Sequence, residues 1–133
     1  MEKIGEVFGW IAAVCYFISV ANFFVKRIFK AWIAKLPKEN AWKKEYQLFM
    51  KLIVKYHRYF GMIAGAFALL HLCWQIVNVR VSYSGVLVTA LMAVTAIFGI
   101  FIAYRKKSSL TNVHRPIALA VLAVILFHMI TKI

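Results

Sequence analysis

The chain has 133 residues, of which 64% are hydrophobic and only 16% are charged. Soluble domains have roughly half their residues apolar and about a quarter charged, so this composition excludes an ordinary soluble domain and indicates an integral membrane protein. About four membrane-spanning helices of roughly 20 residues each account for most of this length. They leave no room among these residues for a separate nucleotide-binding or catalytic domain.

Four long apolar runs predict four transmembrane helices. They cover residues 5–25, 59–79, 83–104 and 113–130. We therefore expect a single domain over residues 1–133, an all-α bundle of four spanning helices. The first six residues, MEKIGE, lack the positive start of a signal peptide, so the first run is predicted to be a retained helix. Asn112 is placed to cap the fourth helix.

The segment between the first two runs, residues 26–58, contains ten Lys and Arg residues among aromatic and aliphatic side chains. Pro37 divides it into two basic, amphipathic pieces. Two arrangements fit this pattern. The pieces lie in the headgroup layer, anchored by Trp32 and Trp42, or they extend the first and second helices beyond the membrane as a hairpin. Such a segment serves topology and membrane anchoring, or it docks a soluble partner.

The basic residues are distributed unequally between the two sides of the predicted bundle. The loops after the first and third helices, together with Arg115, hold fourteen of the seventeen Lys and Arg residues. The positive-inside rule therefore places these loops in the cytoplasm and both termini outside, in a multi-pass protein of the plasma membrane. Beside membrane spans a net charge of +13 reports topology, so no nucleic-acid partner is expected.

The four histidines are the most informative residues of the chain. His57 and His71 lie fourteen residues apart on the second predicted helix, and His114 and His128 lie fourteen apart on the fourth. Fourteen residues make almost four full turns and rise about 21 Å, so each helix carries its two histidines on one face, near opposite sides of the membrane. Because one helix intervenes, the second and fourth helices run parallel. His57 is then predicted to face His114 near the cytoplasmic side, and His71 to face His128 near the outer side.

Two facing imidazoles at each of two depths supply the axial ligands that two six-coordinate haem irons need. We therefore predict that both pairs ligate iron, in two haem b groups held between the parallel second and fourth helices. On the second helix the histidine face carries small residues, Gly61 among them, which leave room for a flat macrocycle, and Gly61 and Gly65 also allow close backbone approach. Arg58, Arg115 and Lys132 lie close to the histidines, where they are suited to bind haem propionates.

Other uses of intramembrane histidine stay open at this stage. Such a residue hydrogen-bonds across a helix interface, lines a proton path or binds a divalent metal ion. A small metal-ion or proton-coupled transporter would be expected to place a carboxylate deep in a helix. All four acidic residues lie instead at or beyond the predicted span boundaries: Glu2, Glu6, Glu39 and Glu45. This distribution disfavours a transporter.

Two histidine-bounded segments carry a resemblance to a known family. HRYFGMIAGAFALLHL on the second helix and HRPIALAVLAVILFH on the fourth resemble the haem helices of transmembrane di-haem cytochromes b, such as the cytochrome b of quinol-oxidising bc complexes and small bacterial b-type cytochromes. The resemblance covers the four-helix core and implies that His57, His71, His114 and His128 are the axial ligands of two b haems. The Pro-Glu-Trp-Tyr motif of quinol oxidation is absent, and any reductase partner is expected to be a separate protein.

These features favour a membrane electron carrier that connects a quinol or reductase donor to an acceptor across or within the membrane. The expected partners are the lipid bilayer, a quinone, and a soluble or membrane redox protein that docks on the basic cytoplasmic segment. Two alternatives are an oxidoreductase acting directly on quinone, superoxide or ferric iron, and a haem-bearing anchor subunit of a larger complex. No catalytic side chain is predicted.

Overall fold

The computed structural model of the chain is all-helical and describes residues 2–78, 80–105 and 108–131. Its elements are α1 (Glu2–Ala31), the short 3-10 helix η1 (Ile33–Lys35), α2 (Ala41–Asn78), α3 (Tyr83–Arg105) and α4 (Ser108–Thr131). Each of the four α-helices is long and apolar enough to cross a membrane. This confirms the expected all-α chain with four helices of spanning length.

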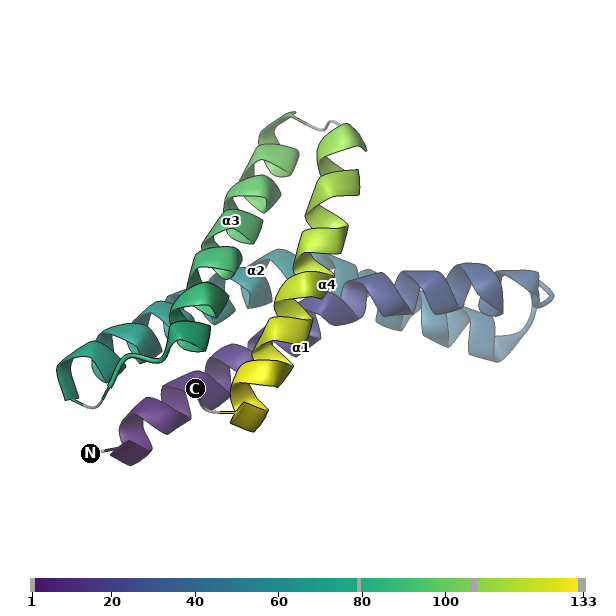
Figure 1. Cartoon of the computed structure of the whole chain (residues 1–133). Coiled ribbons are helices and arrows are strands. Elements are labelled where there is room, and N and C mark those ends of the chain that lie inside the picture. The colour runs from purple at the N-terminus through teal and green to yellow at the C-terminus, as the bar shows by residue number, and fades with distance from the viewer. Residues whose placement is uncertain (1, 79, 106–107, 132–133) are drawn as a thin grey trace.

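Two helical hairpins make up the molecule, as Figure 1 shows. α1 packs along α2 and α3 packs along α4, with further contacts between α2 and α3 and between α1 and α4. α2 and α4 therefore occupy diagonal corners, and within the described residues their backbones do not approach each other. In Figure 1 the α3–α4 hairpin (green to yellow) lies inclined across the longer α1–α2 hairpin (purple to teal).

The basic segment 26–58 continues the first two helices, so the structure has the hairpin form of the two expected arrangements. α1 runs on to Ala31, and α2 begins at Ala41, well before the apolar run that starts at residue 59. Pro37 lies in the turn between them, where its missing N–H and fixed φ suit a helix break. The apolar run marks the predicted membrane span, whereas the helix itself is longer because basic and amphipathic sequence is also helix-forming.

Side chains at the tip of this hairpin hold the turn closed. Lys43 donates from Nζ to the carbonyls of Ala34 (2.9 Å) and Leu36 (2.7 Å). The side-chain oxygen of Asn40 accepts a hydrogen bond of 2.9 Å from the backbone N–H of Trp42 and so caps the start of α2. The tip is therefore an ordered turn that satisfies its own backbone groups.

The fourth helix also starts earlier than expected. α4 begins at Ser108, so the prediction that Asn112 caps it was wrong, and Pro116 lies inside the helix. The proline ring removes the helical N–H partner of the Asn112 carbonyl, a cost that the remaining helix tolerates. Val79, the predicted end of the second span, lies outside the described residues.

The core consists of small and medium-sized side chains where the helices meet. Ala64 of α2 and Val121 of α4 have no exposed area. Tyr16 of α1 is buried, and its hydroxyl donates to the Ala118 carbonyl of α4 at 2.8 Å. Large apolar side chains lie on the outside, among them Trp10, Phe24, Leu69, Leu87, Ile97 and Phe127. An apolar outer surface of this extent is unusual for a soluble monomer.

Replacing Ala64 by Leu tests this packing. The larger side chain has no space between the helices, so Ala64→Leu should lower the free energy of unfolding by about 1–3 kcal/mol. Ala90→Leu, on the exposed face of α3, is the matched control and should change it little. Unfolding of the micelle-bound protein by increasing SDS, followed by circular dichroism, measures both. Equal unfolding of the two variants would contradict the described core.

Candidate functional site

The structure brings the four histidines together as two pairs across the bundle. The ring centres of His57 and His114 lie 6.4 Å apart, and those of His71 and His128 lie 6.5 Å apart. We call the first the basic-end pair, because the basic hairpin leaves the bundle there, and the second the terminal-end pair. Each pair joins the diagonal helices α2 and α4, which run in the same sense. The separations at the two levels are therefore nearly equal.

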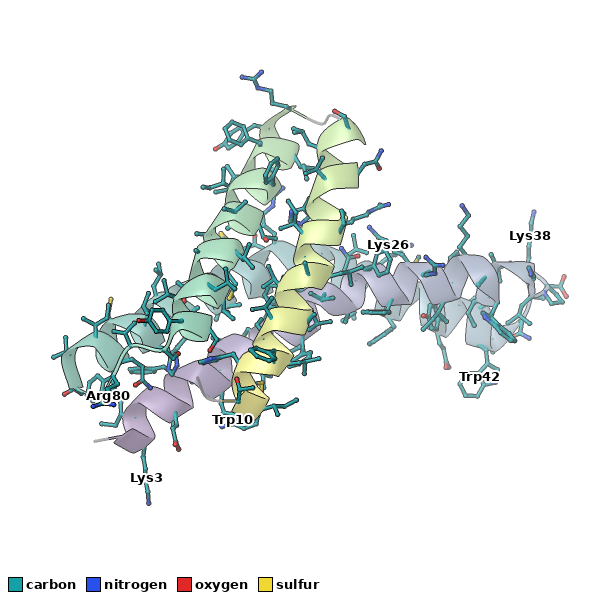
Figure 2. The ribbon with its side chains drawn as sticks, viewed as in Figure 1. Lys3, Trp10, Lys26, Lys38, Trp42 and Arg80 are labelled. Carbon is teal, nitrogen blue, oxygen red and sulfur yellow. The ribbon has the colours of Figure 1, made fainter. Side chains whose placement is uncertain are left out.

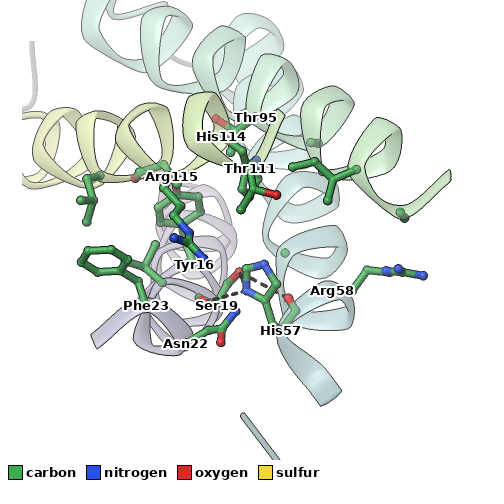
Figure 3. A pocket seen from close by; sticks show the side chains of 18 of the residues that line it. Tyr16, Ser19, Asn22, Phe23, His57, Arg58, Thr95, Thr111, His114 and Arg115 are labelled. Atoms are coloured by element: carbon green, nitrogen blue, oxygen red, sulfur yellow. Dashed lines mark hydrogen bonds between the residues drawn. The ribbon is translucent and has the colours of Figure 1, made fainter. Parts of the chain in front are cut away.

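Helix α1 holds both imidazoles of α2 from behind. Nδ1 of His57 lies 2.8 Å from the carbonyl oxygen of Ser19, and Nδ1 of His71 lies 2.7 Å from that of Gly5. A carbonyl oxygen only accepts, so in each neutral ring the proton is on Nδ1 and Nε2 keeps its lone pair. The Ser19 hydroxyl lies 3.0 Å from the same Nδ1 of His57 (Figure 3). Both α2 histidines are thus oriented by α1, with a metal-binding nitrogen left for the other side.

Helix α3 plays the corresponding part for α4, but unequally at the two ends. At the terminal end, the Ser84 hydroxyl lies 2.8 Å from Nδ1 of His128. At the basic end, Nδ1 of His114 is buried and has no hydrogen-bond partner among the described residues. Both rings of the terminal-end pair therefore have a well-formed hydrogen bond, whereas at the basic end only His57 has one, and His114 lies beside the Thr95 backbone of α3 without such a bond.

Two glycines allow the neighbouring helices to approach the terminal-end rings. A Cβ atom at Gly9 of α1 would lie 3.2 Å from the ring of His71, and one at Gly85 of α3 would lie 3.3 Å from Cε1 of His128. Both distances are tighter than ordinary carbon contacts, so a side chain at either position would push the imidazole. The sequence prediction did not include Gly9 or the hydrogen-bonding residues of α1. The fourteen-residue spacing of Gly5 and Ser19, which matches that of the histidines, is the signal that could have found them.

A cavity of about 1090 Å³ opens at the basic-end pair and is lined by His57, His114, Gly61 and Gly65 among others (Figure 3). This volume is at the upper end of the range for small-molecule and cofactor pockets. A Cβ atom at Gly65 would meet nothing within 4 Å, so the predicted glycine does border open space. A second cavity of about 330 Å³, between α2 and α3, shares both glycines. Neither of these two cavities is lined by a terminal-end histidine.

Cations surround the larger cavity, and its lining contains no carboxylate. The predicted residues Arg58 and Arg115 both line it, and Figure 3 shows Arg115 directed towards the His57 side and Arg58 directed away. Lys26, Arg27 and Lys30 of α1 also line it and were not predicted as site residues. They come from the end of α1, which the sequence placed in a loop. The cavity is therefore suited to a ligand with an apolar body and negative groups at the basic rim.

One predicted residue lies outside the described part of the chain, and one residue of the cavity was not predicted. Lys132, the predicted partner of a ligand at the terminal end, lies outside the described residues. Asn22, which the sequence did not suggest, lines the larger cavity with its side-chain oxygen buried and without a hydrogen-bond partner among the described residues. A bound polar group or a water molecule normally supplies the missing hydrogen bond to a buried polar atom of this kind.

Comparison with known proteins identified no relative. No protein-family model, no curated protein and no solved structure matches this chain. The function of the site therefore has to follow from its own residues and their geometry.

The tautomers of the histidines provide a direct test of this arrangement. We expect the rings of His57 and His71 to carry their proton on Nδ1, because each lies against a carbonyl acceptor. Nitrogen-15 NMR of the ligand-free protein in micelles, with labelled histidine, distinguishes the two tautomers. Ser84→Ala should perturb the resonances of His128, whereas Ser109→Ala, at an exposed position of α4, should not. An Nε2–H tautomer at His71 would contradict the assigned contact.

Proposed function

We propose that this chain is a di-haem b-type membrane cytochrome, which carries electrons between a quinol or reductase donor and an acceptor. This proposal is carried by the two histidine pairs, which join diagonal helices of an apolar four-helix chain. Their ring centres lie 6.4 and 6.5 Å apart. The resemblance of the two histidine-bounded segments to the haem helices of di-haem cytochromes b supports the same assignment.

The number of ligands at each level favours haem over a protein-bound metal ion. The described residues contain no group of three or more His, Cys, Asp or Glu side chains placed to hold a metal ion. A structural zinc site takes four protein ligands, and a catalytic one takes three. Haem brings four equatorial nitrogens of its own and needs the protein only for the axial positions. Two imidazoles per level are what that requires.

The separation of the rings also fits axial ligation. Metal–imidazole bonds of about 2 Å, with about 1.1 Å from Nε2 to the ring centre, place two axial rings roughly 6 Å apart. The observed separations of 6.4 and 6.5 Å are close to this value. The angles between ring planes, 84° and 69°, agree with it as well, because each ligand ring can take any rotation about the common axis.

The surrounding residues have distinct parts in holding such a cofactor. The contacts with α1 leave Nε2 of His57 and His71 with the lone pair that binds iron. Gly61 and Gly65 provide the space for a macrocycle at the basic end, and Arg58 and Arg115 the charges for its propionates. When bound, haem supplies reversible one-electron chemistry at iron, and the chain supplies ligation, spacing and a low-dielectric surrounding.

The membrane placement belongs to the same proposal. Four apolar helices with large exposed aliphatic and aromatic side chains suit a lipid environment. The concentration of Lys and Arg at one end of the bundle favours that end as cytoplasmic, in the plasma membrane, with both termini outside. Electrons would then pass between the two sides through the two histidine levels, about 21 Å apart along the helices.

Visible spectroscopy of single histidine variants tests the cofactor and the pairing together. Wild-type protein purified from haem-sufficient cells should show a sharp low-spin b-type spectrum and about two haems per chain by pyridine haemochrome assay. His71→Ala should retain about one haem, at the basic end, and His57→Ala should retain about one, at the terminal end. Cys73→Ala, exposed and two residues from His71, is the control and should retain both. A colourless wild-type protein, or loss of both haems from every single variant, would overturn the assignment.

Filling the larger cavity provides an independent test. Gly65→Phe places a ring in open space, so the ligand-free protein should fold normally, yet the ring should exclude haem from the basic end. We expect the haem content to fall from about two to about one per chain, with thermal stability of the ligand-free protein almost unchanged. Ala90→Phe on the exposed face of α3 should leave the content at about two. Full haem content in Gly65→Phe would show that this cavity is not the haem site.

A further inference from the structure

The α1–α2 hairpin extends well beyond the rest of the bundle at the basic end (Figure 1). From His57 back to Ala41, α2 has sixteen further residues, which at 1.5 Å each give about 24 Å. From His114 back to Ser108, α4 has six, which give about 9 Å. Beyond the basic-end pair the α1–α2 hairpin is therefore about 15 Å longer than the α3–α4 hairpin, and the two hairpins diverge there (Figure 1).

The projecting hairpin is a rigid platform. The rings of Phe29 on α1 and Tyr46 on α2 are stacked, with centres 6.1 Å apart and planes 17° from parallel. The Tyr46 hydroxyl donates to the Val25 carbonyl at 3.0 Å, and Lys43 closes the tip through two backbone carbonyls. A surface on these helices keeps its shape, so a partner would lose little free energy in ordering it.

One face of this platform is basic. On α2, spacings of seven, four and three residues place Lys44, Lys51, Lys55 and Arg58 on a single helix face. Arg58, at one end of this face, lines the larger cavity, although its side chain is directed away from His57 (Figure 3). Lys26 and Lys30 of α1 line the same cavity, and Figure 2 shows Lys26 where the platform leaves the bundle. We call this surface the basic corner; it comprises Lys26, Lys30, Lys44, Lys51, Lys55 and Arg58.

No carboxylate among the described residues compensates the charges of the basic corner. All six side chains are exposed, and in the part of the chain that the structure describes none of them forms an ion pair with a carboxylate. Residues 26–58 hold ten Lys and Arg residues against two Glu residues. Like charges held close together on a rigid surface repel one another, so an anionic partner would be bound with a Coulombic gain.

A second face of the same helix separates this surface from the lipid. Trp42, Phe49, Leu52 and Tyr56 lie at spacings of seven, three and four residues, on another side of α2, and are 76%, 50%, 47% and 43% exposed. These side chains suit the membrane interface. The basic residues of α2 lie on a different side of the helix, although Lys55 reaches back, with its Nζ 5.4 Å from the centre of the Tyr56 ring. Lys26, Lys30 and Arg58 border the cavity, so this part of the basic corner is available to a soluble molecule.

We propose that the basic corner docks an acidic soluble electron-transfer protein. Bound there, the partner would lie between the platform and the end of the α3–α4 hairpin, next to the cavity of the basic-end pair. That the partner exchanges electrons rests on the proposed cytochrome function, whereas the charge complementarity does not.

Binding of a plant-type [2Fe–2S] ferredoxin, an acidic protein, tests this surface. The full chain, in nanodiscs of neutral phosphatidylcholine, is titrated by microscale thermophoresis. The corner variant Lys44→Gln, Lys51→Gln, Lys55→Gln should bind roughly tenfold more weakly than wild type. The control variant Lys3→Gln, Lys35→Gln, Lys38→Gln loses the same charge elsewhere and should weaken binding by no more than about twofold. Affinity of the wild type should fall as salt rises from about 0.05 to 0.2 M.

Three outcomes would overturn the docking proposal: no binding of ferredoxin by the wild type, equal weakening in the two triple variants, or a corner variant that loses only its binding to phosphatidylserine vesicles. The last would assign the surface to lipid. The binding experiment requires no haem. A colourless protein with the expected binding pattern would refute the cytochrome and keep the docking surface, and a di-haem protein that fails to bind would do the reverse.

Discussion

The hydrogen bonds that the flanking helices make to the histidine rings are the interactions on which the rest of the site depends. The carbonyls of Gly5 and Ser19 fix both the direction and the tautomer of the two α2 rings, because a carbonyl only accepts and the ring nitrogen that faces it, Nδ1, must therefore carry the proton. Such contacts require close helix approach, which explains the small residues where α1 meets α2, such as Ala12, Ala13 and the fully buried Ala64. These contacts also account for the hairpin arrangement, because α1 has to lie along α2 to reach its histidines, while α4 faces α2 across the bundle.

The flanking helices approach the histidine rings more closely at the terminal end than at the basic end. At the terminal end, Gly9 and Gly85 bring α1 and α3 against the rings, and Ser84 contacts His128. At the basic end the helices are farther apart and enclose a large cavity, and Nδ1 of His114 is without a partner among the described residues. The divergence has a physical cause in the inclination of one hairpin across the other, visible in Figure 1, which prevents equal packing at both levels. The same divergence leaves the basic hairpin uncovered.

Local periodicity was enough to predict a large part of this protein. Apolar run lengths gave four helices of spanning length, because hydropathy depends on composition alone. The fourteen-residue spacings gave the pairing of His57 with His114 and of His71 with His128, because helix geometry fixes both face and rise. Arg58, Arg115, Gly61 and Gly65 were found through their proximity to those histidines in the sequence, and all four line the same cavity. Their role towards a cofactor stays a prediction.

Tertiary structure alone decided which other residues reach the histidines. Ser19 and Gly9 are unremarkable within their own helix, and they matter only because α1 packs against α2 in one register. The true starts of α2 and α4 were missed because apolarity marks the span, while hydrogen-bonded helix continues into polar sequence. By itself the sequence determined an all-helical chain, four helices of spanning length and the two histidine levels, all of which follow from composition and helical repeat. How the two hairpins cross is encoded by no local pattern. That crossing decides which helix lies behind each histidine, why the two ends have unequal cavities and why the basic corner projects.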